Sequence, residues 1–196
     1  MQRLILSVPA GTEPAALAAA LEAGDVAAVV IVGGLTEPSS LIETAQDRGA
    51  AALISRNLDE GGASPWLIPT AADGLHLDGD FTARRGAIEA RPEGMTVGAT
   101  AASRHEAMTL GEGGSDYVWF GTVDALSESA AEMACWWQAL FEVPAVLAGP
   151  ADDASLALMI ATRVEFIAVN VFQSNADPAA RVASIDALLR EGAVTS

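Results

Sequence analysis

Ala71-Ala72-Asp73-Gly74-Leu75-His76-Leu77-Asp78-Gly79-Asp80 is the most informative segment of the sequence for the fold. A short apolar run around His76 leads directly into two carboxylates separated by a glycine, which is the pattern of a buried strand ending in a loosened turn. In proteins built from alternating strands and helices, such turns commonly carry the chemistry. Asp78 and Asp80 are therefore candidate ligands of a hard cation, and a solvated acidic loop is the alternative interpretation.

The same switch from an apolar run to a helical pattern recurs along the whole chain. Apolar runs of strand length lie near residues 3–8, 26–32, 51–55, 74–78, 95–99, 115–120, 144–148 and 164–171. Helical patterns fill most gaps, at 13–23, 38–48, 82–90, 103–112, 127–141, 151–162 and 177–190. Capping residues precede three of these helices, at Thr12, Thr36 and Asp177. The segment 57–71 contains Gly and Pro pairs and predicts a short or broken helix.

Strands that alternate with helices favour parallel pairing through strand–helix–strand units. With eight such strands in 196 residues, closure predicts a single compact α/β domain over residues 1–196, a (β/α)8 TIM barrel. An open doubly wound sheet is the alternative. No glycine-rich dinucleotide-binding turn follows the first strand, and Gly33-Gly34 after the second lacks the required spacing.

The charged residues exclude several classes of partner. The net charge is −16, and all ten cationic side chains are Arg, so we expect neither nucleic acid nor an anionic membrane as a partner. Any mechanism that needs a lysine amine is excluded. No apolar run is long enough to span a membrane, and the apolar stretch near the first residue is too short for a secretory signal. We therefore predict a cytoplasmic protein. Cys135 is the only cysteine, and we expect it to be buried in the core.

Three segments together resemble the thiamine phosphate synthase and TenI-like family. Ala72-Asp73-Gly74-Leu75-His76-Leu77 is similar to its A-D-G-V-H-L strand, and Val97-Gly98-Ala99-Thr100 to its G-V-S strand. Gly114-Ser115-Asp116-Tyr117-Val118-Trp119-Phe120-Gly121 is similar to its G-A-D-Y-V-x-F-G strand. The resemblance implies a barrel that binds a hydroxymethylpyrimidine diphosphate and a thiazole phosphate at the C-terminal mouth, with Mg²⁺. It also implies two activities, joining these substrates or aromatising the thiazole phosphate.

Several positions depart from the family's motifs. The diphosphate-binding Q-x-R-E-K after the second strand is replaced by residues 31–37, which contain no cation, and the metal-binding Asp of I-N-D-R is missing at Ser55-Arg56-Asn57. The resemblance makes Asp80 the best equivalent of the Asp in G-Q-x-D, and a Mg²⁺ ligand together with Asp78. Thr122 replaces the His of the tautomerases, and its hydroxyl cannot replace an imidazole as a proton shuttle near neutral pH.

The scarcity of cations argues against a diphosphate substrate. No Lys or Arg lies between Arg104 and Arg163, and only Arg56, Arg84 and Arg85 are placed to help. Losing two or three charge-assisted contacts at roughly 1.5–3 kcal/mol each would lower the affinity by several orders of magnitude. A smaller phosphate ligand could contact Gly149 and Asn170 after the last two strands, although Asp152 and Asp153 add negative charge there.

The sequence leaves two functions open, and the loss of most synthase residues favours the first. One is a binding or regulatory protein for a thiamine-related small molecule, without synthase activity; the other is a thiamine-biosynthesis enzyme with a rearranged site. His76 is either a satisfied core histidine or a catalytic one, and Trp136 and Trp137 cannot both point inward, so one could anchor a homodimer. The candidate residues are Asp80, Thr122 and His76 for catalysis; Arg56, Thr100, Gly149 and Asn170 for ligand binding; and Asp78 and Asp80 for Mg²⁺.

Overall fold

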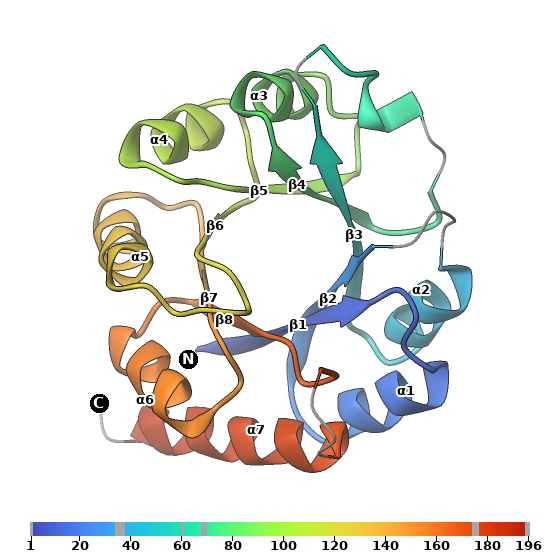
Figure 1. Cartoon of the computed structure of the whole chain (residues 1–196), viewed down its shortest axis with the longest axis vertical. Coiled ribbons are helices and arrows are strands. Elements are labelled where there is room, and N and C mark those ends of the chain that lie inside the picture. Colours follow the sequence, from blue (N-terminus) through green and yellow to red (C-terminus); the bar gives the residue numbers. More distant parts are fainter. Residues whose placement is uncertain (1, 34–37, 60, 68–69, 174–176, 195–196) are drawn as a thin grey trace.

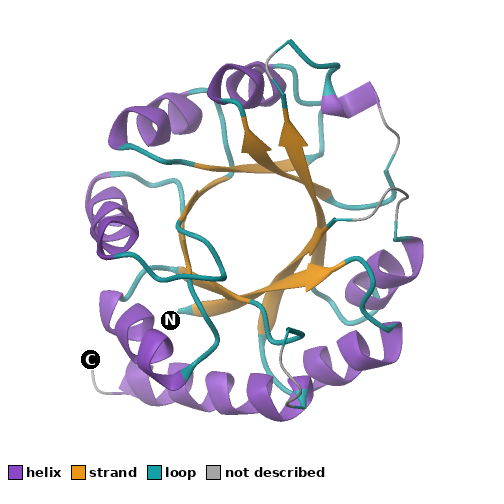
Figure 2. Cartoon of the chain, in the orientation of Figure 1, coloured by secondary structure: helices purple, strands orange, loops and turns teal. Residues whose placement is uncertain are grey.

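Eight parallel strands close into a barrel in the order in which they occur along the chain. This computed structural model describes residues 2–33, 38–59, 61–67, 70–173 and 177–194. The strands are β1 (Arg3–Pro9), β2 (Val26–Val32), β3 (Ala51–Leu58), β4 (Gly74–Gly79), β5 (Thr96–Thr100), β6 (Tyr117–Phe120), β7 (Ala145–Ala148) and β8 (Phe166–Val169). Figures 1 and 2 show the closed ring of strands with the helices outside it. The predicted (β/α)8 barrel is confirmed, and the open sheet is excluded.

Helices follow the strands and cover the outside of the barrel (Figure 1). They are α1 (Pro14–Glu22), α2 (Ser39–Gln46), α3 (Phe81–Glu89), α4 (Arg104–Glu112), α5 (Glu128–Leu140), α6 (Asp153–Thr162) and α7 (Pro178–Val194). Between β3 and β4, the described residues contain only a single 3-10 turn, η1 (Pro65–Leu67), in place of a full helix. The weak helical signal of segment 57–71 predicted this break. None of the described helices is long and apolar enough to cross a membrane.

Because side chains alternate along each strand, the buried residues form two cores, one inside the barrel and one between the barrel and the helices. In β6, Val118 and Phe120 face outward and pack under the helices, whereas Trp119 faces inward. The inner core fills the lower part of the barrel with residues such as Ile5, Leu53 and Val146, while polar side chains gather above it at the C-terminal mouth. The lumen is therefore a packed core with a polar upper layer, and that layer is where a site can form.

Several local expectations have different outcomes. Asp177 caps α7 as predicted, since its Oδ1 accepts a hydrogen bond from the Ala179 N–H at 3.0 Å. The expected Thr12 cap is wrong, because α1 begins after Glu13 with no side-chain cap. The Thr36 cap lies outside the described residues. Cys135 is exposed rather than buried, because it lies on the outer face of α5.

The two adjacent tryptophans on α5 differ in burial, as the sequence predicts. Trp137 is fully buried against Phe120 and Phe141, and its indole N–H donates to the Val143 carbonyl at 2.7 Å. Trp136 is half-buried, and the guanidinium of Arg104 lies 4.7 Å from its ring centroid. An intramolecular cation thus covers Trp136, and a homodimer at this helix stays a prediction.

Candidate active site

A small cavity opens at the C-terminal mouth of the barrel. Its volume is about 170 Å³, enough for one heterocyclic ring. Inward-facing positions of the strands supply most of its wall, because alternate side chains of each strand point to the lumen. The lining residues are Ser7, Val30, Val32, Ser55, His76, Asp78, Thr100, Trp119, Gly121, Thr122 and Val123. Four hydroxyls, one imidazole and one carboxylate thus surround an apolar floor.

His76 occupies the centre of the polar layer. Only 3% of its surface is exposed, and its ring faces the lumen between those of Tyr117 and Trp119. The Nδ1 atom lies 3.0 Å from the Tyr117 hydroxyl, whereas Nε2 lies 3.2 Å from Thr100 Oγ1 and 3.5 Å from Asp78 Oδ2. Both ring nitrogens therefore have polar neighbours, and the Nε2 side is the one that meets the cavity.

A glycine makes room for this arrangement. Gly98 faces inward on β5, beside Tyr117 on β6, and a Cβ atom added to Gly98 would overlap the Tyr117 ring. The Tyr117 ring therefore lies flat across the backbone of β5 and stacks at 4° to the plane of the His76 ring. The absence of a side chain at Gly98 on β5 thus leaves space for the Tyr117 ring, which in turn positions the imidazole of His76 on β4.

Tyr117 sets which nitrogen of His76 carries the proton. Burial, together with the negative charges of Asp78 and Asp116, raises the pKa of Tyr117 far above its ordinary value, so the phenol keeps its proton. Its hydroxyl partner among the described residues is Nδ1 of His76, and a buried hydroxyl donates wherever an acceptor is available. Neutral His76 then carries its proton on Nε2, directed at Asp78 and Thr100.

Asp78 is the ionised partner of this pair. Burial acts to raise its pKa, but hydrogen bonds from His76 and Thr100, the charge of the His76 imidazole when it is protonated and the charge of Arg84 together hold the pKa below the ordinary value. Its side chain is 41% exposed, so a ligand in the cavity can reach it. The cavity wall thus presents one proton acceptor and one proton donor side by side, which is the minimum for moving a proton on a bound substrate.

Comparison with known proteins places this barrel in a family. A family model described as thiamine monophosphate synthase matches residues 35–171. A thiamine-phosphate synthase from Rhodospirillum centenum is 33% identical over 96% of this chain and 98% of its own length. The chain belongs to the thiamine monophosphate synthase/TenI family. A second thiamine-phosphate synthase, from Hyphomonas neptunium, is 29% identical over 86% of this chain and 82% of its own.

Solved structures agree with the family at the level of the fold. The thiamine phosphate pyrophosphorylase from Pyrococcus furiosus superposes with a TM-score of 0.74 at 20% identity, covering 97% of this chain and 96% of that one. The 3-hexulose-6-phosphate synthase from Salmonella typhimurium superposes with a TM-score of 0.72 at 14% identity, covering 97% of this chain and all of that one. At these identities the likeness shows the barrel alone.

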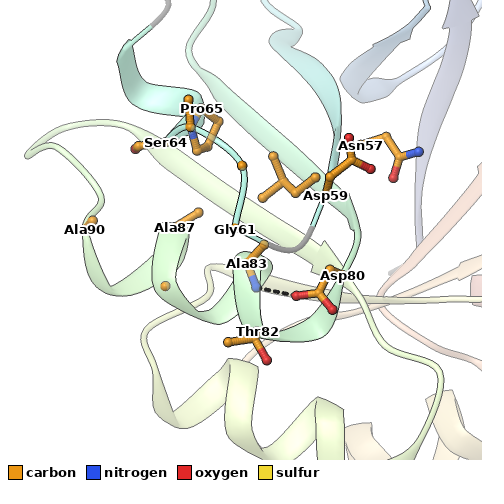
Figure 3. A pocket seen from close by; sticks show the side chains of 14 residues that line it. Asn57, Asp59, Gly61, Ser64, Pro65, Asp80, Thr82, Ala83, Ala87 and Ala90 are labelled. Carbon is orange, nitrogen blue, oxygen red and sulfur yellow. Dashed lines mark hydrogen bonds between the residues drawn. The ribbon is translucent and has the colours of Figure 1, made fainter.

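The family's motif positions are divided between two cavities in this chain. Thr100 and Thr122 line the lumen cavity with His76 and Asp78. Asp80 instead faces a separate cavity of about 410 Å³, between the chain that follows β3 and helix α3 (Figure 3). There its Oδ1 accepts the Ala83 N–H at 2.8 Å and caps α3.

The two carboxylates predicted as Mg²⁺ ligands line different cavities, and a Mg²⁺ ion held by both stays a prediction. Asp78 contacts His76 and Thr100 in one cavity, whereas Asp80 caps a helix in the other. Asp59 and Asn57 line the second cavity with Asp80 (Figure 3). Over the described residues, no group of three or more His, Cys, Asp or Glu side chains could hold a metal ion.

The predicted ligand-binding residues are dispersed. Gly149 packs against the Met159 side chain, and Asn170 lines a third cavity of about 590 Å³ at the ends of β7 and β8. Arg56 lies at the end of β3, where its buried Nε has no hydrogen-bond partner among the described residues. Arg84 is buried and pairs with Glu106 at 3.1 Å, while Arg85 pairs with Glu89 on the helix surface. None of these three arginines lines the lumen cavity.

Three polar or aromatic residues of the cavity wall, and Tyr117 behind His76, were not singled out from the sequence as site residues. Ser7 and Ser55 are single hydroxyls in apolar runs, a pattern too common to be informative. Alternation along β6 turns Trp119 inward, on the opposite side from Val118 and Phe120. Tyr117 belongs to the D-Y-V-x-F-G motif, but its contact with His76 depends on the pairing of β4, β5 and β6.

Proposed function

We propose that this chain is an enzyme of thiamine-biosynthesis type that transfers a proton on a small heterocyclic substrate held in the lumen cavity. The observation that carries the proposal is the pairing of His76 Nε2 with Asp78 Oδ2 at 3.5 Å on the wall of that cavity. In the family's tautomerases the imidazole follows the sixth strand, where this chain has Thr122. His76 brings an imidazole to the same cavity from β4 instead.

The geometry supports a tautomerisation with a balanced exchange of protons. The ionised Asp78 accepts a proton from one atom of the heterocycle, while the Nε2–H of His76 donates a hydrogen bond that stabilises the negative charge left on the ring. The protonated Asp78 then returns the proton to a second ring atom, so that Asp78 is ionised again, His76 is unchanged and the ring leaves as its isomer. Thr100 orients both groups, since it lies within hydrogen-bonding distance of Nε2 and is hydrogen-bonded to Asp78. No leaving group and no co-reactant is needed.

The test is solvent proton exchange into thiazole phosphate and the corresponding thiazole alcohol, followed by NMR in D₂O, together with aromatisation of the non-aromatic tautomer. We expect His76→Gln and Asp78→Asn each to lower the rate at least a hundredfold. His105→Gln is the matched control, because His105 is exposed on α4. Exchange at the background rate with the native chain, or unchanged rates in both variants, would contradict the proposal. Ligand binding without turnover would then indicate the binding or regulatory role.

Synthase-type coupling is the second candidate, because the two relatives at 33% and 29% identity are named thiamine-phosphate synthases. This reaction requires residues that bind the diphosphate. A bound diphosphate would give the buried Nε of Arg56 the hydrogen-bond partner that it lacks among the described residues. Formation of thiamine phosphate from the two substrates, lost in Arg56→Gln and retained in Arg85→Gln, would support this candidate over the tautomerase.

A further inference from the structure

Every positive side chain of this protein can be located, because all ten are Arg and all lie in the described ranges. Seven of them form ion pairs: Arg3–Asp25, Arg48–Glu22, Arg84–Glu106, Arg85–Glu89, Arg91–Asp116, Arg181–Asp153 and Arg190–Asp186. Arg104 covers Trp136, Arg163 ends α6, and Arg56 lies near the end of β3. None of the ten lines the lumen cavity, whose wall carries the carboxylate of Asp78.

The cavity at the ends of β7 and β8 is also acidic. It shares Val123 with the lumen cavity, so the two spaces adjoin. Asp124, Asp152 and Asp153 line it, together with one cation, Arg181. The guanidinium of Arg181 already contacts Asp153 Oδ1 at 2.8 Å and donates from Nε to the Ala151 carbonyl at 2.7 Å. Its charge is thus balanced within the protein.

At the starts of α6 and α7, the described residues include backbone donors that already bind a carboxylate of the chain itself. The start of a helix after the seventh or eighth strand is the usual phosphate site of such barrels, because its N–H groups are free. Here Asp152 accepts the Ser155 N–H at 2.9 Å and the Ser155 hydroxyl at 2.7 Å, and these bonds lower its pKa. Asp177 accepts the Ala179 N–H at the start of α7. Carboxylates of the chain itself thus occupy the positions of a bound anion.

We infer that the site takes a non-phosphorylated heterocycle, a neutral or protonated ring alcohol rather than its phosphate ester. The inference rests on the proposed function for the location of the site, and it specifies the substrate class. The ring fills the 170 Å³ lumen cavity next to Asp78, and its hydroxyalkyl arm extends past Val123 into the acidic space. A dianionic phosphate on that arm would meet three carboxylates with no unpaired cation among the lining residues.

The experiment is calorimetric titration of the native chain with a matched pair, hydroxyethylthiazole and its phosphate, at fixed ionic strength. We expect the alcohol to bind at least tenfold more tightly than the phosphate. Equal or tighter binding of the phosphate would overturn the inference, and so would failure of both to bind. If the phosphate binds more tightly and also undergoes exchange, the proposed function stands without the inference. If the alcohol binds more tightly and no exchange occurs, the inference stands without the proposed function.

One variant tests the cause directly. Asp152→Ser retains a capping hydroxyl on α6 but removes the charge, so we expect the affinity for the phosphate to rise about threefold to tenfold relative to that for the alcohol. Asp47→Ser is the matched control, because Asp47 is exposed at the C-terminal end of α2, away from the mouth. An equal change for both ligands, or an equal effect of the control, would remove the electrostatic explanation.

Discussion

Asp78 and Asp80 are two residues apart, yet they belong to regions with opposite characters. Asp78 is part of a cluster carried by strands, in which His76, Thr100 and Tyr117 hold one another by side-chain contacts across the lumen. Asp80 belongs with Asp152 and Asp177 to the aspartates that begin helices, each of which accepts a backbone N–H. The first group faces a ligand-sized cavity with its acid and base exposed to it, whereas the second uses its charge to complete a helix.

The difference indicates which carboxylates can still react with a substrate. A carboxylate at a helix start is satisfied by the backbone, so it stabilises locally and contributes only its field to a neighbouring ligand. A carboxylate on a strand end is held by other side chains, and any of these can be exchanged for substrate. Changes in the lumen cluster should therefore affect stability and proton transfer together, whereas changes at the helix starts should affect stability and ligand charge preference but not proton transfer.

The largest effect is expected for Gly98→Ala. The added Cβ overlaps the Tyr117 ring, so the ring must move and release His76, at a cost of about 2–3 kcal/mol in the free energy of unfolding. Urea denaturation measures this loss. Gly86→Ala is the control, because its Cβ would meet nothing within 4 Å on the exposed side of α3, and a gain of about 0.5–1 kcal/mol is expected. Similar changes in the free energy of unfolding for the two variants would show that the contact between Gly98, Tyr117 and His76 does not contribute to stability.

Tyr117→Phe should lower the free energy of unfolding by about 1–2 kcal/mol, because Nδ1 of His76 loses its donor in a buried site. It should also redistribute the imidazole proton between the two ring nitrogens. ¹⁵N NMR of the two histidines measures this, and His105 serves as the control in the same spectrum because it is exposed. An unchanged His76 spectrum would show that Tyr117 does not set the tautomer.

Asp80→Ala tests the helix-start group. Loss of the cap on α3 should lower the free energy of unfolding by about 1 kcal/mol, with proton exchange on the substrate unaffected. Asp80→Asn, which keeps the capping acceptor, should recover most of the stability. A large loss of activity in both variants would instead show that Asp80 is a catalytic residue.

The smallest effect is the pH dependence carried by Asp78. Because its folded pKa lies below the ordinary value of 3.8, its ionisation contributes stability that is fully present above that pH and is lost as pH falls through the lowered folded pKa. The difference in melting temperature between the native chain and Asp78→Asn should thus be constant near neutral pH and shrink below about pH 4. A difference that grows on acidification would contradict the assigned direction.

Much of the fold was predictable because it depends on local patterns. The eight apolar runs, the helical periods between them and the Gly- and Pro-rich break before β4 each follow from short-range rules, and the order of elements leaves few topologies. Asp177 as a helix cap is equally local. Cys135 was placed wrongly because its apolar neighbours Trp136 and Trp137 suggested burial, whereas its own position on α5 faces outward.

Residue identity and short-range order are enough to specify the barrel, the family motifs and the complete absence of lysine. Which polar residues meet depends instead on how the strands pair when the barrel closes. His76 could have faced either layer until closure of the barrel brought β5 and β6 beside β4 and set Tyr117 on one side of its ring and Asp78 on the other. The division of Asp78 from Asp80 has the same cause: one residue ends a strand inside the closed ring, and the other begins the helix outside it.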